Sequence, residues 1–306
     1  MTIAVLIPTF RRNESLQRAL QSVFAQTRRP DLIVVADNAP EAGARALVEG
    51  LREIAPCPLI HVHADQPGVA NARNAGFEAC KGHSRIAQLD DDESANPGWL
   101  AALDSMADTT GAAVTFGPVC AAAQDAGAVR TAWLRRLYAR LPGLEDGLTD
   151  KPWGCGNSLI DRDRAALPTP PFDPAANETG GEDDRLFSIL SSQGARFAWA
   201  GGAHVVEHVE SRRGAWPALV RRAFAFGQGP SQDAAAHKNL ARLAAWMVIG
   251  ALQSAVFALL AIPARLISAR ACALCLDKAV QGAGKLVWFD RFAPRFYGAA
   301  LARTTA

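Results

Sequence analysis

The sequence predicts an α/β fold with a mostly parallel sheet and helices on both of its faces. Two observations support this prediction. Short apolar runs alternate with segments of helical spacing over residues 3–116, and the runs are continuously apolar, as in buried parallel strands. Repeated βα units of this kind build a parallel sheet flanked by helices. A third observation sets the last part of the chain apart, because residues 244–262 carry no charge.

Each expected element is predicted from its apolar periodicity and from the residues that cap or end it. The expected strands cover residues 3–7, 32–36, 59–63, 85–89 and 112–116, with two shorter ones at 195–200 and 203–208. The expected helices cover about 42–54, 68–80, 130–140 and 182–193. Asn13 is expected to cap a further helix that carries Leu16 and Leu20 on one face, and Asn96 to cap another with Pro97 at its first position.

Composition excludes several classes of protein. With 306 residues, 49% of them hydrophobic and 20% charged, the chain holds one large or two smaller domains and is not disordered. Its net charge of +2 indicates no bulk attraction to nucleic acid, so no nucleic-acid partner is expected. Six cysteines are too few for a disulfide scaffold and favour a reduced compartment. The apolar N-terminus has no preceding basic residue and indicates a first strand, not a signal peptide.

Four consecutive acids, Asp90 to Glu93, follow the strand expected at 85–89. Neighbouring carboxylates repel one another, and a hard cation such as Mg²⁺ or Mn²⁺, held together with substrate phosphates, compensates them. The alternative is a solvated acidic turn at the start of the next helix. Both interpretations stay open from the residues alone.

Ligands of open α/β sheets bind beyond the carboxyl ends of the strands. Pro8 to Arg11 end the first strand, Asp37 ends the second and the four acids follow the fourth, so all three groups are expected at one sheet edge. Asp37 suits hydrogen bonds from a base or ribose, and Arg11 or Arg73 suits a diphosphate. The alternatives are that Asp37 shapes a turn and that Arg73 is a surface charge on its helix.

An ordered set of motifs extends these observations. It comprises Val5-Leu-Ile-Pro-Thr-Phe-Arg11, Val34-Val-Ala-Asp-Asn38, Gly68-Val-Ala-Asn-Ala-Arg-Asn-Ala-Gly76, Leu89-Asp-Asp-Asp-Glu93, Pro97-Gly-Trp-Leu100, Trp153-Gly-Cys-Gly-Asn157, Gly180-Gly-Glu-Asp-Asp184 and Val206-Glu-His-Val-Glu-Ser-Arg212. Over about residues 3–230 this set resembles the family 2 glycosyltransferases of the GT-A fold. The tract at 212–227 is similar to the bacterial branch that builds lipid-linked exopolysaccharide units, of the succinoglycan glucosyltransferase type.

The resemblance assigns roles to particular residues. It implies that Asp183 is the general base and that Glu182 orients the acceptor. The implied nucleotide-sugar contacts are Pro8, Thr9, Arg11, Asp37, Arg73, Asp90, Asp91 and Asn157, and the implied metal ligands are Asp92, Asp90 and His208. The residues also admit plainer interpretations: Glu182 and Asp183 favour a helix start, Asn157 fits an ordinary turn and His208 fits a structural role.

The function that follows from the resemblance is an inverting, metal-dependent sugar transfer in cell-surface polysaccharide synthesis. The implied donor is a nucleotide-diphosphate sugar, a UDP-sugar in particular, and the implied acceptor a saccharide or a lipid-linked (polyprenyl-diphosphate) saccharide. Two alternatives remain: a nucleotidyltransferase acting on sugar phosphates and a non-catalytic membrane-docked scaffold. A dehydrogenase is disfavoured because no GxGxxG follows the first strand.

The last part of the chain predicts a second region. We expect a catalytic domain over residues 1–230 and a helical, membrane-associated region over 231–306. The uncharged segment 244–262 is about 28 Å long as a helix, close to the roughly 30 Å of a hydrocarbon core, although an apolar core helix would show the same composition. Basic residues after Ile262 disfavour a single crossing. We therefore expect an in-plane helix, with Phe296 and Tyr297 among the headgroup contacts, at the cytoplasmic face of the bacterial inner membrane.

Overall fold

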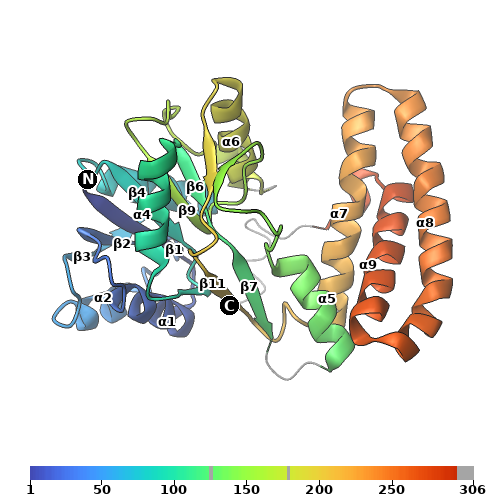
Figure 1. The fold of residues 1–306 in the computed structure, drawn as a ribbon, viewed down its shortest axis with the longest axis horizontal. Helices are drawn as coiled ribbons and strands as arrows, with labels where there is room; N and C mark the ends of the chain where they lie inside the picture. The colour runs from blue at the N-terminus through green and yellow to red at the C-terminus, as the bar shows by residue number, and fades with distance from the viewer. Residues whose placement is uncertain (124–126, 178–179, 295–306) are drawn as a thin grey trace. The chain divides into compact units, whose positions relative to one another are not determined.

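The computed structural model describes residues 1–123, 127–177 and 180–294 (Figure 1). The chain forms two compact units: unit 1 contains residues 1–120 and 140–208, and unit 2 contains residues 121–139 and 209–294. The sequence boundary proposed at residue 230 falls inside helix α7, Trp216–Ala236, and stays a prediction. The headgroup contacts expected of Phe296 and Tyr297 lie outside the described residues.

Unit 1 contains most of the strands. They are β1 Ile3–Thr9, β2 Leu32–Asp37, β3 Leu59–His63, β4 Arg85–Leu89, β5 Glu93–Ala95, β6 Val114–Phe116, β8 Gly147–Thr149, β9 Asn157–Asp161 and β10 Phe197–Trp199. Two more, β7 Val119–Ala123 and β11 Val205–Val209, lead from unit 1 into unit 2. The helices of unit 1 are α1 Asn13–Phe24, α2 Arg45–Leu51, α3 Val69–Ala79, α4 Trp99–Thr110, the 3₁₀ turn η1 Pro174–Asn177 and α6 Glu182–Ser192.

The main sheet has eight strands in the order β3-β2-β1-β4-β9-β6-β10-β8. The pairs β3-β2, β2-β1, β1-β4 and β6-β10 are parallel, which confirms the mostly parallel sheet. Strand β9 runs antiparallel to both β4 and β6, and β8 runs antiparallel to β10. A second sheet has the order β5-β11-β7.

Alternate residues of β1 enter two separate cores. Ile3, Val5 and Ile7 pack on one face with α1, α2 and α4, whereas Ala4 and Leu6 pack on the other face with α3 and α6. This alternation follows from the two-residue period of a strand. The continuously apolar run at the N-terminus is therefore explained by burial on both faces, as predicted.

Two expected helix starts are wrong by a few residues. Asn13 is the first residue of α1 instead of its cap, because its side-chain amide donates to the Gly43 carbonyl while Arg12 takes the cap position. The helix that we expected to follow a cap at Asn96 is α4, and it begins later, at Trp99. The reason is that Asn96 takes part in a turn, in which its carbonyl accepts from the Trp99 amide. The expected helix at 42–54 is the shorter α2. Strands β5, β7, β8 and β9 were not predicted, because three to five residues show too little periodicity.

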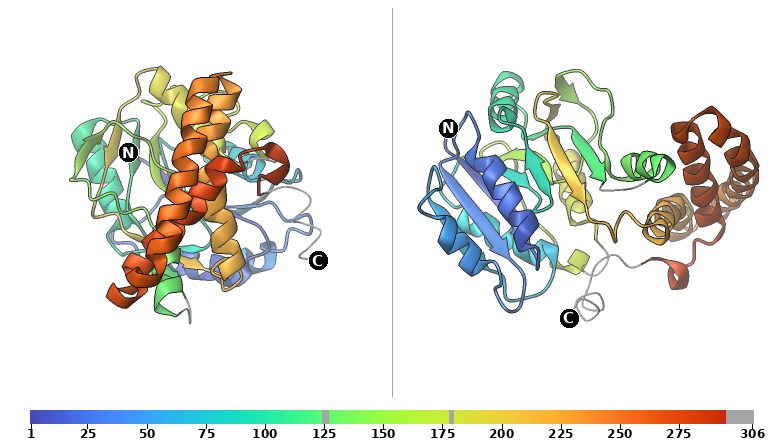
Figure 2. Two further views of the ribbon diagram at one scale, coloured as in Figure 1. Left: turned by 90° about the vertical axis from the view of Figure 1, so that its right-hand side faces the viewer. Right: turned by 90° about the horizontal axis from the view of Figure 1, so that it is seen from below.

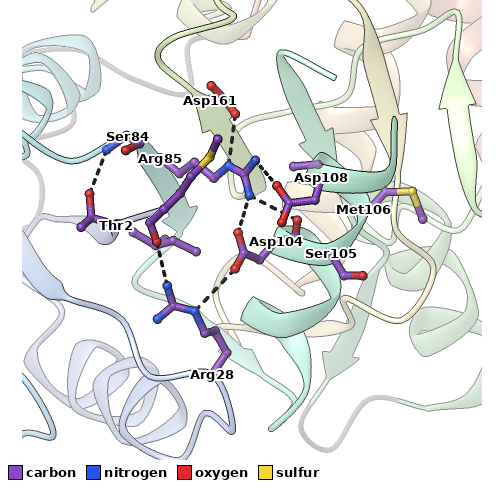
Figure 3. Close-up of polar contacts among 12 residues, drawn as sticks. Thr2, Arg28, Ser84, Arg85, Asp104, Ser105, Met106, Asp108 and Asp161 are labelled. Atoms are coloured by element: carbon purple, nitrogen blue, oxygen red, sulfur yellow. Dashed lines mark hydrogen bonds and ion pairs between the residues drawn. The ribbon is translucent and has the colours of Figure 1, made fainter. Parts of the chain in front are cut away.

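A buried arginine joins the start of β4 to its neighbours (Figure 3). The side chain of Arg85 is fully buried; its Nε lies 3.1 Å from Asp161 Oδ2 and its Nη2 lies 2.6 Å from Asp108 Oδ1. Nη1 donates to Asp104, which Arg28 also contacts. We call Arg85 with Asp104, Asp108 and Asp161 the Arg85 cluster. It lies at the amino end of β4 and ties that strand to β9 and α4.

Unit 2 is helical. Its helices are α5 Ala128–Tyr138, α7, α8 Leu240–Ile267, α9 Ala269–Leu286 and the 3₁₀ turn η2 Asp290–Phe292. Helix α9 lies between α7 and α8 and also contacts α5, and the two further views show the same packing (Figures 1 and 2). Glycines allow the close approach: a Cβ at Gly227 would lie 2.1 Å from the Gln281 carbonyl oxygen, and one at Gly282 would lie 2.7 Å from that of Gly250.

Helix α8 confirms the apolar C-terminal helix. Of the helices in the described ranges, it is the one that is long and apolar enough to cross a membrane, with a mean hydropathy of 2.0 over a window of which 6% is buried. Its polar residue Gln253 faces α9, where it donates to the Lys278 carbonyl at 2.7 Å and accepts from Lys285 Nζ at 3.1 Å. The opposite face exposes large side chains such as Leu252 and Leu259.

Candidate active site

The carboxyl ends of β1, β2 and β4 lie next to one another at one edge of the main sheet. The parallel register pairs Thr9, the last residue of β1, with Asp37, the last residue of β2. On the other side of β1, Leu6 pairs with Gln88, so β4 ends at Leu89, directly before the acids. The polar groups that follow these strands therefore share one edge, as predicted.

The four acids form a folded turn between β4 and β5, which we call the acidic cluster (Asp90, Asp91, Asp92 and Glu93). The Glu93 amide donates to the Asp90 carbonyl at 3.0 Å, and the Asp90 amide donates to Glu93 Oε2 at 3.2 Å. Asp91, Asp92 and Glu93 are at most 5% exposed. The alternative of a solvated acidic turn is therefore not supported.

Thr9 and Arg12 hold two members of the acidic cluster. Thr9 Oγ1 donates to Asp91 Oδ2 at 2.8 Å. Arg12 Nη1 donates to Asp91 Oδ1 at 3.1 Å and to Asp92 Oδ2 at 3.0 Å. One guanidinium thus bridges two carboxylates and partly offsets their mutual repulsion.

Arg11, which the sequence analysis placed at the diphosphate, lies elsewhere. Its Nε is 2.7 Å from Glu41 Oε1 and its Nη2 is 3.1 Å from Glu41 Oε2, on the exposed surface. The backbone of Arg11 has a φ of 55°, so the chain reverses there and Arg12 is directed toward the acids. Sequence reasoning missed Arg12, although it is the adjacent basic residue; the positive φ carries no sequence signal in a non-glycine residue.

Asp37 is fully buried and already engaged by protein groups. Its Oδ1 accepts from the Ala39 amide and its Oδ2 from the Ala44 amide, both at 2.9 Å, and His61 Nε2 lies 3.1 Å from Oδ2. The turn-forming alternative for Asp37 is thus supported, and a nucleotide contact stays a prediction. Pro8, in the same strand pair, lies opposite Ala36 and is also buried.

Arg73, from α3, connects the acidic cluster to the first turn of α6. Its Nη2 donates to Asp90 Oδ1 at 3.0 Å, and its Nη1 lies 3.7 Å from Glu182 Oε1. The side chain is almost completely buried, yet within the described residues Nε and Nη1 have no hydrogen-bond partner. The surface-charge alternative for Arg73 is therefore wrong, because surrounding residues exclude it from solvent.

Residues 154–156 pass between Asp183 and Asp90. The Cys155 amide donates to Asp183 Oδ2 at 3.3 Å. A Cβ at Gly154 would lie 3.1 Å from Asp183 Oδ2, and one at Gly156 would lie 2.5 Å from Asp90 Oδ2. Only glycine therefore allows the chain to run this close to both carboxylates. Arg140, a second residue that sequence reasoning missed, donates to the Gly154 carbonyl.

Four carboxyl groups of this edge, those of Asp90, Asp91, Glu93 and Glu182, have raised pKa values. Burial, reinforced by neighbouring carboxylates, raises the pKa of Asp91 to about 6 even though Arg12 opposes the shift. Burial likewise raises the pKa of Asp90 and raises that of Glu93 well above its usual value. The pKa of Glu182 is raised by burial against the opposing charge of Arg73. Burial is thus the main cause of the raised pKa values at this edge, and the nearby arginines offset it only in part.

Asn157, for which the resemblance implied a sugar contact, is engaged by protein groups. Its side chain is fully buried at the start of β9. Its Nδ2 donates to the carbonyls of Pro118 and Ala203, and its Oδ1 accepts from Trp99 Nε1 at 2.8 Å. With its side-chain amide engaged and no surface exposed, Asn157 joins β9 to its surroundings, and a sugar contact stays a prediction. The motif carried no sign of this burial.

His208, from β11, lies beside the acidic cluster. Its main-chain amide donates to the Asp92 carbonyl at 2.8 Å, and its Nε2 lies 2.7 Å from Ser94 Oγ. Burial, with help from the positive charge of Arg18, lowers the pKa of the imidazole. A neutral ring suits a metal ligand, but its Nε2 is paired with Ser94 here, so metal ligation by His208 stays a prediction.

The residues present fit a divalent ion only when the substrate supplies ligands as well. Within residues 1–123, 127–177 and 180–294, no group of three or more His, Cys, Asp or Glu side chains is placed to hold a metal ion by itself. The acidic cluster nevertheless provides buried carboxylate oxygens with raised pKa values. Mg²⁺ is commonly bound in this way, by one or two carboxylates together with substrate phosphates.

The geometry therefore brings together three kinds of group at one edge: carboxylates suited to a cation, a buried guanidinium suited to a phosphate, and a carboxylate in the first turn of a helix. Asp183 lies in that first turn and is half-buried, within reach of solvent. A carboxylate so placed can accept a proton from a hydroxyl.

Comparison with known proteins identifies the family. The sequence pattern of glycosyl transferase family 2 matches residues 4–163. The succinoglycan biosynthesis protein ExoM of Rhizobium meliloti (strain 1021) is 34% identical over 230 residues, which cover 74% of this chain and 73% of ExoM. An uncharacterized glycosyltransferase of Nostoc sp. (strain PCC 7120) is 34% identical over 97 residues, covering 32% of this chain and 30% of that protein.

A solved structure shows the same fold. The structure of GalNAc-T7 with UDP, GalNAc and Mn²⁺ aligns with a TM-score of 0.54 at 17% identity; the match covers 76% of this chain and about half (51%) of that one. The α/β fold with its mostly parallel sheet is thus that of the GT-A glycosyltransferases, and neither the nucleotidyltransferase nor the scaffold alternative finds support in these matches. The chain is a glycosyltransferase that belongs to family 2.

Proposed function

We propose that the chain transfers one sugar from a UDP-sugar to a saccharide or lipid-linked saccharide, with inversion at the anomeric carbon, in the synthesis of a cell-surface polysaccharide. The observation that carries this proposal is Arg73, which lies between Asp90 and Glu182 and leaves Nε and Nη1 without a hydrogen-bond partner among the described residues. A buried, incompletely paired guanidinium is costly unless a ligand completes it, and a diphosphate does so.

Asp92, with Asp90, is proposed to hold Mg²⁺ or Mn²⁺ on the diphosphate, and His208 remains a candidate third ligand. When bound, the ion neutralises the charge that develops on the leaving diphosphate. Arg12 orients both carboxyl groups, because its Nη1 donates to Asp91 Oδ1 at 3.1 Å and to Asp92 Oδ2 at 3.0 Å. Thr9 Oγ1 donates to the second oxygen of Asp91. Asp91 is then positioned for the ribose, as the resemblance implies.

Asp183 is proposed as the general base. Asp183 lies in the first turn of α6, and the Cys155 amide, which donates to Asp183 Oδ2 at 3.3 Å, orients its carboxyl group. Asp183 accepts the proton of the acceptor hydroxyl as the oxygen attacks the anomeric carbon, while Glu182, beside it, orients the acceptor. Attack from the face opposite the diphosphate inverts the configuration and requires no covalent bond to the enzyme.

The membrane is the proposed location, at the cytoplasmic face where nucleotide sugars are available. Large apolar side chains of α8 point away from α9, while Gln253 and Gly250 point toward it, the reverse of a helix on a soluble surface. Helix α9 packs along α8 and carries Asp277, Lys278 and Lys285, which are costly in the bilayer centre. We therefore propose that α8 lies in the plane of one leaflet.

A donor screen tests the catalytic proposal. UDP-, GDP- and dTDP-sugars are incubated with Mn²⁺ and a lipid-linked acceptor extract, and the release of free nucleotide is measured. The proposal predicts UDP release from one UDP-sugar, dependent on acceptor and abolished by a chelator. Equal release in chelator would overturn the metal role, and release of pyrophosphate would indicate nucleotidyl transfer instead.

A pair of double variants tests the membrane proposal. Leu252→Glu with Leu259→Glu places charges on two α8 side chains that are 63% and 74% exposed. Leu141→Glu with Leu148→Glu changes two leucines of unit 1 that are 59% and 58% exposed and serves as the matched control. The unmodified chain and the control should sediment together with vesicles of anionic phospholipid, and the α8 double variant should stay in the supernatant.

A reporter fused after Ala306 tests the topology. A cytoplasmic signal is expected, and a periplasmic signal would contradict the in-plane arrangement.

A further inference from the structure

Helix α3 binds residues 172–177, the segment that precedes the first turn of α6. Asn74 donates from Nδ2 to the Phe172 carbonyl at 2.7 Å and accepts at Oδ1 from the Phe172 amide at 2.9 Å. A single side chain thus satisfies both main-chain groups of Phe172, as a neighbouring strand would. The Phe172 ring is fully buried and makes an edge contact with Phe77 of the same helix, with centroids 5.3 Å apart.

Asn177 attaches the other end of this segment to the beginning of α3. Its Oδ1 accepts from the Ala70 amide at 2.9 Å, so a residue more than 100 positions away caps the helix. Gly68 makes room for the contact, because a Cβ there would lie 2.1 Å from Asn177 Cγ, and its φ of 132° also requires glycine. Asn38 in turn accepts from the Gly68 amide, which ties this junction to the end of β2.

The 172–177 segment also contacts α6. Asp173 Oδ2 accepts from Arg185 Nη1, and the Gly180 amide donates to the Ala176 carbonyl at 2.7 Å. Arg185 lies two positions after Asp183 along the chain. A displacement of the segment from α3 would therefore move the first turn of α6 and, with it, Glu182 and Asp183.

Arg73 lies on the same helix as both anchoring points. Its guanidinium carbon is 5.6 Å from the centre of the Phe172 ring, and its Nη2 donates to Asp90. Helix α3 consequently fixes two things at once: the arginine proposed for the diphosphate, and the segment that leads to the proposed base. The distance between the donor side and the acceptor side of the site thus depends on α3.

We infer that Asn74 and Asn177 are positioning residues, which hold the first turn of α6 at the working distance from the acidic cluster. This inference rests on the proposed function of Asp183. Neither asparagine touches the reacting groups, and both act through the main chain of residues 172–177. Because a displacement of about 1 Å in a catalytic group costs up to about 10²-fold in rate, the loss of either anchor is expected to appear in kcat.

The test compares Asn177→Ala and Asn74→Ala with Asn71→Ala, a control on the exposed side of α3. Among the described residues, Asn71 donates to the carbonyls of Gln66 and Pro67 in the preceding loop and has no hydrogen bond to residues 172–177. We expect kcat for the UDP-sugar selected by the donor screen to fall at least about tenfold in both test variants, with the affinity for UDP and Mn²⁺ changed less than about twofold. The control should keep both values.

Asn177→Asp gives the rescue. It retains the oxygen that caps α3, so kcat should return to within about threefold of the unmodified chain. A general loss of packing would instead lower UDP affinity together with kcat, and it would not be restored by aspartate. Unchanged kcat in Asn177→Ala and Asn74→Ala, or equal losses in the Asn71→Ala control, would overturn the inference.

Hydrogen exchange separates failure of this inference from failure of the proposed function. The amides of Ala70, Gly180 and Arg185 are each bonded within this junction, to Asn177 Oδ1, Ala176 and Gly181. They should exchange faster in Asn177→Ala and not in Asn71→Ala, even in a chain that transfers no sugar. Unchanged exchange would contradict the inference regardless of activity. If Asn177→Ala does not fold, the inference is tested with Asn74→Asp, which keeps the acceptor oxygen and loses the donor. The same three quantities are then measured: kcat, UDP affinity and hydrogen exchange.

Discussion

The two ends of β4 carry two arginine–carboxylate clusters of opposite character. At the amino end, Arg85 is surrounded by three aspartates and all of its side-chain nitrogens donate to them. At the carboxyl end, Arg73 donates to Asp90 but leaves two nitrogens without a hydrogen-bond partner among the described residues, while the nearby carboxyl groups have raised pKa values. Both arginines are buried. The first cluster is satisfied within the protein, whereas the second leaves donors for the ligand proposed above.

This difference indicates that the Arg85 cluster contributes to stability and that the acidic cluster contributes to binding. The Arg85 cluster lowers the pKa of Asp108 through its hydrogen bond to the guanidinium, as expected for a balanced ion pair. The acidic cluster does the opposite, since burial and mutual repulsion raise its pKa values. Strongly perturbed carboxyl groups gather where a site binds something that the free protein lacks. The following changes test whether the two ends of β4 differ in this way.

The largest effect is expected at Asp183. Asp183→Asn keeps the size of the side chain and removes its ability to accept a proton, so transfer should fall by about 10²–10⁴-fold. UDP affinity, measured by calorimetry with Mn²⁺, should change little. The matched change in the Arg85 cluster, Asp104→Asn, should leave the turnover of folded protein near normal. Normal turnover in Asp183→Asn would move the base elsewhere, with Asp184 the next candidate.

The second effect is on stability and concerns Arg85. Arg85→Met leaves the buried Asp161 without its principal partner, and the free energy of unfolding should fall by about 3–5 kcal/mol. Urea denaturation of the ligand-free chain measures this. Arg164→Gln, which removes a partly exposed contact to the same aspartate at 3.4 Å, serves as control and should cost less than about 1 kcal/mol. Equal losses in the free energy of unfolding in the two variants would show that the burial of Arg85 does not account for its contribution to stability.

The same chemical change should have opposite signs at the two ends of β4. Glu93→Gln removes one of several crowded, buried carboxylates and should raise the free energy of unfolding at pH 7 by about 0.5–2 kcal/mol. Asp161→Asn removes a partner of Arg85 and should lower it. Urea denaturation of both variants, side by side, gives the comparison. Destabilisation by both changes would mean that the acidic cluster is balanced in the absence of a ligand.

A further test uses the pH dependence of stability. Asp91 has a folded pKa of about 6, above the ordinary value of about 3.9, so the folded state binds its proton more tightly. The corresponding stability is present below about pH 4 and is lost as the pH rises through 6. Asp91→Asn should reduce the slope by this share while the other raised carboxyl groups, Asp90, Glu93 and Glu182, keep theirs, which urea titrations at pH 4, 5, 6 and 7 measure. An unchanged slope in the variant would assign it to other groups.

Much of the site could be predicted because the strands end where polar residues begin. The apolar runs of β1, β2 and β4 stop where the strands end, so the strand ends could be predicted. Because the strands are parallel, Thr9, Asp37 and the acidic cluster then had to lie at the same edge of the sheet. The contacts of Arg12 with the acidic cluster were missed, because the positive φ at residue 11 has no sequence signature in an arginine. The same limit applies to Asn157, whose burial depends on contacts with residues 39 and 46 positions away.

Other features depend on long-range packing that no local pattern reveals. Asp277 of α9 accepts from Trp133 and Arg136 of α5, more than 140 residues earlier, so α5 belongs with the C-terminal helices. Strands β5 and β8 are three residues long and are defined by their partners. The outward face of α8 was predicted as apolar, but the inward orientation of Gln253 is seen only once α9 is in place.

The binding of Mn²⁺ with and without UDP tests the central claim most directly. Calorimetry on the unmodified chain should show weak binding of Mn²⁺ alone, because the acidic cluster supplies only part of a coordination shell, and binding at least tenfold tighter once UDP supplies phosphate oxygens. Asp92→Asn should abolish this gain, whereas Asp104→Asn in the Arg85 cluster should retain it. Equal Mn²⁺ affinity with and without UDP, or an unchanged gain in Asp92→Asn, would contradict the account of the carboxyl edge as a ligand-dependent site.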